Sequence, residues 1–198
     1  LEFDHSIKGN PDPDKETAVQ VIRTSASVRW SDIVMLYQAL IKMAKKNIRI
    51  TTAYFNPNKV MVNLLKEAAR RGVNVQIMVP GKNIDKHIAR IAGDDSFENL
   101  LESKVDLRYS QKTMLHSKII TIDDELSCVG SANFNHRSML KDDEVNVVML
   151  DKEVTSILNK HFEEDLTHCE KIKHGEWKKR SMLKRMAEKI TQLVNRQI

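Results

Sequence analysis

Four side chains that suit phosphate chemistry flank two short apolar runs in the second half of the sequence. His116 and Lys118 precede the first run, and Ser131 and Asn133 follow the second. The polar turn between the runs favours a β-hairpin, and side-chain alternation places His116 and Lys118 on one face. The hairpin would bring an imidazole, an ammonium, a hydroxyl and an amide to one end of a sheet. Lysine supplies charge, serine and asparagine supply hydrogen bonds, and histidine can attack or donate a proton, so the group predicts a phosphate site. It lacks the cysteine or carboxylate cluster of a metal site.

The elements expected around this hairpin are strands alternating with helices. Apolar residues recur at helical spacing through the first helix, and the run at 73–79 is of the kind buried in a parallel sheet. Strands are expected at 18–23, 48–53, 73–79, 105–109 and 144–150, helices at 33–46, 58–71 and 154–168, and shorter helical stretches around 84–91 and 96–102. This order predicts an α/β/α sandwich on a mixed β-sheet.

Composition places the chain among ordinary globular proteins. It has 198 residues, 41% hydrophobic and 30% charged, which is enough for one domain with a core and an appendage. No apolar run approaches the ~20 residues that span a bilayer, and no signal-peptide pattern is present. The net charge of +5 permits an anionic partner such as a lipid headgroup or nucleic acid without demanding one. Cys128 and Cys169 offer no disulfide or metal framework.

The two ends of the chain differ from its centre. Residues 1–15 are polar and contain glycine and proline, so we expect a linker or a cloning-derived arm on a fragment of a longer protein. We assign 16–170 to one lobe. Residues 171–198 are basic, with apolar residues at every fourth position from 182 to 194, which indicates an amphipathic helix. This helix either packs on the lobe or contacts an anionic membrane surface or a missing part of the protein.

The stretch from His116 to Asn133 resembles the HKD signature of the phospholipase D superfamily. The matching residues are His116-x-Lys118-x4-Asp123-x6-Gly130-Ser131-Ala132-Asn133. The alternative is an ordinary strand with a surface histidine and lysine. The resemblance implies a two-step transfer without metal or cofactor: one histidine attacks phosphorus to form a phosphohistidine, and a second histidine protonates the leaving alcohol. An incoming hydroxyl or water then releases the product.

The resemblance also implies a role for each polar residue. Lys118 and Asn133 would stabilise the charged phosphoryl oxygens, and Ser131 would add a hydrogen bond. Glu144, at the start of a later strand, would hold one imidazole nitrogen of His116; the alternative for Glu144 is a solvated strand end. Asp123 is expected to hold the turn rather than to take part in the chemistry.

The mechanism requires two His-x-Lys sets, and the sequence contains one. A second HKD lobe is therefore expected, either in a missing N-terminal half or in a second copy of the chain. In two-lobed relatives the first lobe usually supplies the nucleophile. His116 would then be the general acid of a C-terminal lobe, although the sequence leaves nucleophile and acid open.

Further segments resemble bacterial cardiolipin synthases, although Ser117 and Asn135 depart from the family's commoner residues. The similar segments are 48–57, 71–75, 79–82, 137–138 and the tail from Trp177 to Arg180. This resemblance implies a phosphatidyltransferase lobe that makes cardiolipin from phosphatidylglycerol at an anionic bacterial membrane, peripherally or on its cytoplasmic face. The fragment itself would be soluble.

Two other functions are weighed against the synthase. The first is a homodimeric phospholipase D-type phosphodiesterase or nuclease, and nucleic acid is a partner only in that case. The second is a catalytically silent membrane-binding or scaffold lobe. The intact set of His116, Lys118, Asn133 and Glu144 argues against silence.

Overall fold

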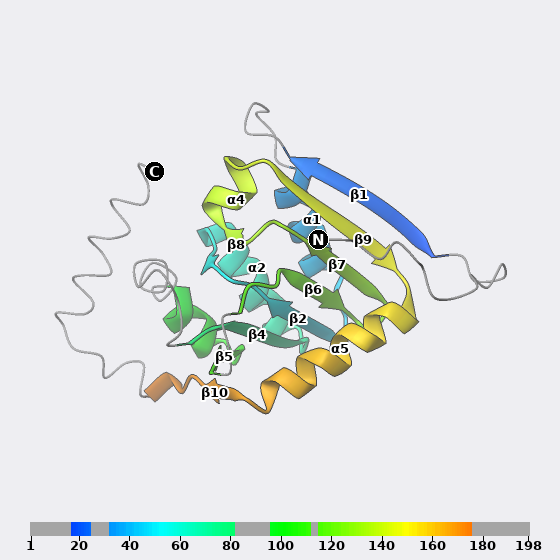
Figure 1. Cartoon of the computed structure of the whole chain (residues 1–198). Coiled ribbons are helices and arrows are strands. Elements are labelled where there is room, and N and C mark those ends of the chain that lie inside the picture. The colour runs from blue at the N-terminus through cyan, green and yellow to red at the C-terminus, as the bar shows by residue number, and fades with distance from the viewer. Residues whose placement is uncertain (1–16, 25–31, 82–95, 112–114, 176–198) are drawn as a thin grey trace.

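The computed structural model describes residues 17–24, 32–81, 96–111 and 115–175 (Figure 1). The expected stretch at 84–91, the arm at 1–15 and the tail beyond residue 175 lie outside these residues. No helix within them is long and apolar enough to cross a membrane.

The described residues form a mixed sheet in the order β1-β9-β7-β6-β2-β4-β5-β10. Its strands are β1 (Ala18–Thr24), β2 (Asn47–Thr51), β4 (Asn74–Pro80), β5 (Asp106–Ser110), β6 (Ile119–Ile122), β7 (Leu126–Gly130), β9 (Glu144–Leu150) and β10 (Cys169–Lys171). The pairs β2–β4 and β4–β5 are parallel, and the others are antiparallel. The sheet and its flanking helices confirm the predicted α/β fold.

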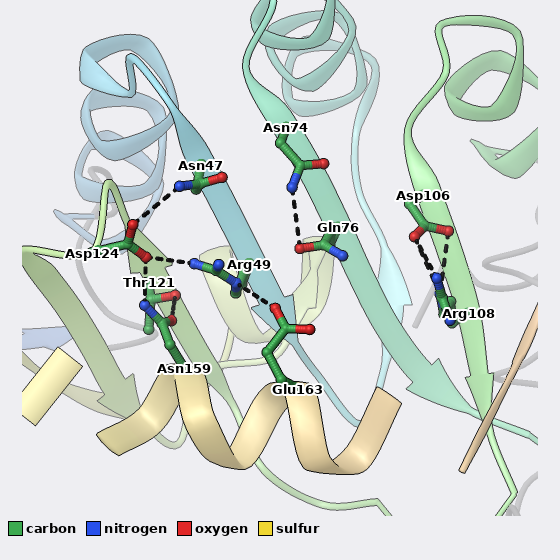
Figure 2. Close-up of polar contacts among 10 residues, drawn as sticks. All are labelled: Asn47, Arg49, Asn74, Gln76, Asp106, Arg108, Thr121, Asp124, Asn159 and Glu163. Carbon is green, nitrogen blue, oxygen red and sulfur yellow. Dashed lines mark hydrogen bonds and ion pairs between the residues drawn. The ribbon is translucent and has the colours of Figure 1, made fainter. Parts of the chain in front are cut away.

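Helices cover both faces of this sheet. The helices are α1 (Asp32–Met43), α2 (Lys59–Arg70), α4 (His136–Leu140) and α5 (Lys152–Leu166), and residues 96–102 are also helical. The apolar residues of α1 and α2 form the main core with alternate residues of the central strands, including Ile50 and Ile77. On the opposite face α5 packs over β2, β5, β6 and β7. Phe162 and Leu166 of α5 pack there against Met78, and polar side chains of the helix also contact the sheet (Figure 2).

Two element boundaries differ from those expected. The first helix ends at Met43 rather than at residue 46, because the carboxylate of Asp123 accepts the backbone N–H groups of residues 45–47. Those N–H groups are therefore not available to continue the helix. The hairpin strand begins at Ile119, so His116 and Lys118 lie in an extended arm before it.

A small second sheet links the segments that follow β2 and β7. Strand β3 (Phe55–Asn56) pairs in parallel with β8 (Phe134–Asn135). The rings of Phe55 and Phe134 stack with centroids 5.5 Å apart, and Tyr37 of α1 stacks on Phe134 at 5.4 Å. We expected no strand at residues 54–57. The pairing places this segment directly beside the loop that carries Ser131 and Asn133.

Candidate active site

The arm from residue 115 to 118 holds a histidine and a lysine against each other. Its backbone is fixed to β7, because Gly130 N donates to Lys118 O at 3.2 Å. The Lys118 ammonium donates to the carbonyl of His116 at 2.6 Å and lies 3.0 Å from Nδ1 and 3.3 Å from Nε2 of that ring. His116 is exposed, whereas Lys118 is buried. The arrangement presents an imidazole to solvent with a cation beside it.

The charge of Lys118 is held in partly dehydrated surroundings. Burial lowers the pKa of the Lys118 ammonium, and the negative charge of Glu144 opposes part of this shift. No carboxylate of the described residues forms an ion pair with the Lys118 ammonium. The cation is therefore available to an incoming anion.

Gly130 lets the loop after β7 pass close to β9. A Cβ atom at this position would lie 2.2 Å from Asn146 Oδ1 and 2.3 Å from Val145 O, closer than such atoms approach. Ser131, the next residue, donates its backbone N–H to Val145 O at 2.9 Å. The glycine of the motif is thus required by packing.

Glu144 contacts Ser131 rather than His116. The Ser131 hydroxyl donates to the Glu144 carboxylate and accepts the backbone N–H of Val145 at 3.0 Å. The expected hydrogen bond between Glu144 and His116 is not among the contacts of the described residues. The orienting role of Glu144 therefore stays a prediction.

Asn133 is held by a segment that our sequence reasoning did not assign to the site. Its Oδ1 accepts the backbone N–H of Tyr54 at 3.2 Å, and its Nδ2 lies 3.5 Å from Ser138 Oγ. Thr52, two residues before Tyr54, accepts the backbone N–H of Phe134. The resemblance in residues 48–57 was a signal for this segment, but it did not indicate contact with the loop.

Asp123 lies at the opposite end of β6 from His116. Its carboxylate accepts three backbone N–H groups, from residues 45, 46 and 47, at 2.7–2.9 Å. Although burial alone would raise the pKa of Asp123, these hydrogen bonds and the charge of Lys46 lower it below its usual value. Its φ of 52° belongs to the tight turn. Asp123 therefore joins the hairpin turn to the start of β2 and does not reach the reacting groups.

Proteins of known family resemble this chain in sequence and in fold. Residues 37–166 match a family model described as "Cardiolipin synthase, PLD-like domain". The chain is 37% identical over 174 residues to the "Probable cardiolipin synthase" of Bacillus subtilis, covering 88% of this chain and 34% of that protein. It spans about a third of the length of the curated relatives that it matches.

Two solved structures share the fold. The phospholipase D family member Nuc from Salmonella typhimurium has a TM-score of 0.69 at 22% identity, with 80% of this chain and 99% of that chain covered. The phosphatidylserine synthase of Haemophilus influenzae has a TM-score of 0.67 at 18% identity, with 91% and 45% covered. The described lobe thus corresponds to a whole chain in one neighbour and to less than half of a chain in the other.

Proposed function

The chain belongs to the phospholipase D-like family of cardiolipin synthases, and from this premise we propose that it is one catalytic lobe of a phosphatidyltransferase. Membership confirms the resemblance read from the segment between His116 and Asn133. The observation that carries the proposal is the Lys118 ammonium beside the exposed ring of His116, next to a loop that offers hydroxyl and amide groups.

The proposed reaction converts two phosphatidylglycerol molecules into cardiolipin and glycerol. One histidine of a pair attacks phosphorus, a P–N bond forms, and the P–O bond to glycerol breaks. The other histidine gives its proton to the departing glycerol oxygen and then takes a proton from the hydroxyl of the second phosphatidylglycerol. That hydroxyl oxygen displaces the first histidine and completes the new phosphodiester. His116 supplies one member of this pair.

Three other side chains are assigned to the phosphoryl group and one to orientation. Lys118 and Asn133 neutralise the oxygens on which negative charge accumulates, and Ser131 adds a hydrogen bond. Glu144 orients His116 once substrate takes the hydroxyl of Ser131. This last step is supported by the contact of Glu144 with Ser131, in the loop that follows Gly130, whose N–H donates to Lys118 O.

The second histidine is proposed to come from another phospholipase D-like lobe. Such lobes generally work with a second lobe or a second copy, and the relatives are long enough to contain one. A bare apolar face supports this partner. Val19 and Val21 of β1 and Val145 of β9 are 55%, 60% and 44% exposed. They lie on the same face of the sheet as α5, on two strands beside those that α5 packs over. Val145 directly follows Glu144 in β9, so the apolar residues begin at the end of the strand where the site lies, although the two side chains point to opposite faces of the sheet.

The proposed substrate is a phospholipid, and the proposed location is peripheral, at the anionic bacterial membrane. The names of the relatives support the phospholipid substrate, and the membrane location follows from that substrate. The basic helix predicted for residues 171–198 stays a prediction beyond residue 175. Within the described part, Lys171 belongs to β10 and Ile172 is buried in the core, while the division of the chain at residue 170 stays a prediction.

The test is the conversion of phosphatidylglycerol into cardiolipin and glycerol by the complete enzyme that contains this lobe. His116→Ala should lower turnover by about a hundredfold to ten-thousandfold or more, because it removes a proton-transfer or nucleophilic group. His161→Ala is the matched control, since His161 is also exposed and lies on α5. A folded His116→Ala enzyme with normal turnover would overturn the assignment.

A homodimeric phosphodiesterase or nuclease is the second candidate, and it is supported by the shared fold with Nuc, of whose chain the match covers 99%. Sedimentation of the 198-residue chain, beside hydrolysis of a chromogenic phosphodiester, separates the two candidates. An active dimer favours the phosphodiesterase, with two copies of His116 completing one site. An inactive monomer favours the synthase lobe.

A further inference from the structure

The side-chain amide of Asn133 has one fixed orientation. A backbone N–H can only donate, so the atom that faces Tyr54 N at 3.2 Å must be the amide oxygen. The NH2 group therefore points away from Tyr54. Its contact with Ser138 Oγ is 3.5 Å long, at the outer limit of a hydrogen bond, and uses at most one of its two N–H groups. At least one good donor is left for a ligand.

A single buried hydroxyl joins the two chain segments that determine this orientation. Thr52 is 2% exposed. Its Oγ1 donates to Tyr54 O at 3.1 Å and accepts Phe134 N–H at 3.1 Å. One of these partners is the residue whose N–H fixes the amide, and the other is the chain neighbour of Asn133. Thr52 therefore fixes the separation between Tyr54 and the backbone next to Asn133, and so the distance from Tyr54 N to the side-chain amide of Asn133.

The loop is also braced from its other side, where Ala132 makes two buried hydrogen bonds. Its N–H donates to Asn146 Oδ1 at 3.3 Å, and its carbonyl accepts the Tyr37 hydroxyl at 3.2 Å. Asn146 Nδ2 in turn donates to Tyr37 Oη at 2.9 Å. Burial raises the pKa of Tyr37, which keeps this donor protonated. With the backbone at Ala132 fixed, the side chain of Asn133 is left to be set by Tyr54 and Thr52.

We propose that Thr52 is a positioning residue that holds the amide NH2 of Asn133 toward the phosphoryl oxygen of the substrate. The inference rests on the proposed function. Thr52 touches no reacting atom and acts through Tyr54, Phe134 and Asn133. Its contribution is to orient in advance a donor that stabilises charge in the transition state.

The experiment compares Thr52→Val, which keeps the shape and loses the hydroxyl, with Thr52→Ser, which keeps the hydroxyl. In the complete enzyme, Thr52→Val should lower kcat by about tenfold to a hundredfold with KM little changed. The reason is that the amide of Asn133 would no longer be held in the position in which it stabilises the transition state. Thr52→Ser should restore most of kcat. Thr155→Val is the matched control: Thr155 is 0% exposed, and its hydroxyl has no hydrogen-bond partner among the described residues.

A second variant tests the amide itself and decides the matter if Thr52→Val does not fold. Asn133→Asp can still accept the N–H of Tyr54 but places an oxygen where the NH2 group was. Its kcat should fall as far as that of Asn133→Ala. Normal kcat in a folded Thr52→Val enzyme, or in Asn133→Asp, would overturn the inference. Normal turnover in His116→Ala would instead remove the proposed function, whatever Thr52 does.

Discussion

Two polar clusters lie at the same sheet and use similar residue types, but they differ in whether their charges are paired. The site cluster consists of His116, Lys118, Ser131, Asn133 and Glu144. The α5 cluster consists of Arg49, Thr121, Asp124, Asn159 and Glu163 (Figure 2). In the α5 cluster every charged group has a partner of opposite charge, whereas the ammonium of the site cluster makes no ion pair with a carboxylate of the described residues.

The α5 cluster joins the helix to the sheet through a closed set of contacts. Arg49 lies 2.7 Å from Asp124 and 3.2 Å from Glu163 (Figure 2). Asn159 donates to Asp124 at 2.7 Å and accepts the hydroxyl of Thr121 at 2.6 Å. Mutual pairing of this kind stabilises a fold and leaves little capacity for a ligand. Unpaired charge, rather than polar composition, distinguishes the site cluster from the α5 cluster.

The largest expected effect is on turnover, and it separates two variants that each remove the cation of one cluster. Lys118→Gln should lower turnover by about a hundredfold to a thousandfold, because a preorganised positive charge at the phosphoryl oxygens is lost. Its unfolding temperature should change little, since burial already disfavours the charge of Lys118. Arg49→Gln should keep turnover and lower the unfolding temperature. Turnover assays and thermal unfolding are measured for both variants. If Arg49→Gln lost turnover and Lys118→Gln lost stability, the two clusters would not differ in the way proposed.

Asp123, in the turn between the two clusters, is expected to stabilise the fold to an extent that depends on pH. Asp123→Asn keeps the turn conformation that asparagine tolerates but loses a charged acceptor of three N–H groups. The free energy of unfolding should fall by about 2 kcal/mol near neutral pH, a value reduced from the sum of three such bonds because water reaches the carboxylate. Thermal or urea unfolding measures it.

The sign of the pH dependence follows from the lowered pKa of Asp123 in the folded protein. A group of this kind stabilises the fold fully above its unfolded pKa of about 4, and the stabilisation is lost as pH falls through the folded value. The difference between wild type and Asp123→Asn should therefore be constant near neutrality and shrink in acid. A difference that grows in acid would contradict the role of the carboxylate.

Asp123 and its neighbour show how far the sequence could predict the site. The polar turn between two apolar runs predicted the hairpin, because a hairpin depends on residues close in sequence, and the motif identified Asp123 as the residue that holds the turn. The sequence did not predict that the Asp123 carboxylate binds the backbone N–H groups of residues 45–47, or that Asp124 binds Arg49 and Asn159. Their directions are set by the tight turn, in which both residues have positive φ angles.

Contacts between distant segments were the part that sequence could not supply. The bond from Tyr54 to Asn133 joins residues 79 positions apart and exists because β3 and β8 pair. The contact of Glu144 with Ser131 depends on the register of β7 against β9. Motif spacing reports which groups are present, and the register of paired strands decides which of them meet.

Asn159 tests whether the α5 cluster is structural only. Asn159→Leu removes one buried hydrogen bond, from Thr121, and one part-buried hydrogen bond, to Asp124. The free energy of unfolding should fall by about 1–3 kcal/mol, the usual cost of leaving a buried polar group unsatisfied. Turnover at a temperature well below unfolding should match wild type. If Asn159→Leu had the stability of wild type but a reduced turnover, the α5 cluster would belong to the active site instead.

The smallest expected effect concerns the exposed carboxylate at the end of the α5 cluster. Glu163→Gln breaks the ion pair with Arg49, but the Glu163 side chain is 52% exposed and water competes with the pair. The free energy of unfolding should fall by at most about 1 kcal/mol, and the loss should shrink as salt screens the charges. Glu164→Gln is the matched control on α5, because Glu164 is exposed and makes no ion pair among the described residues. Urea unfolding at low and high salt measures both variants. A loss as large as that of Asn159→Leu would mean that the paired charges, rather than the amide, join α5 to the sheet.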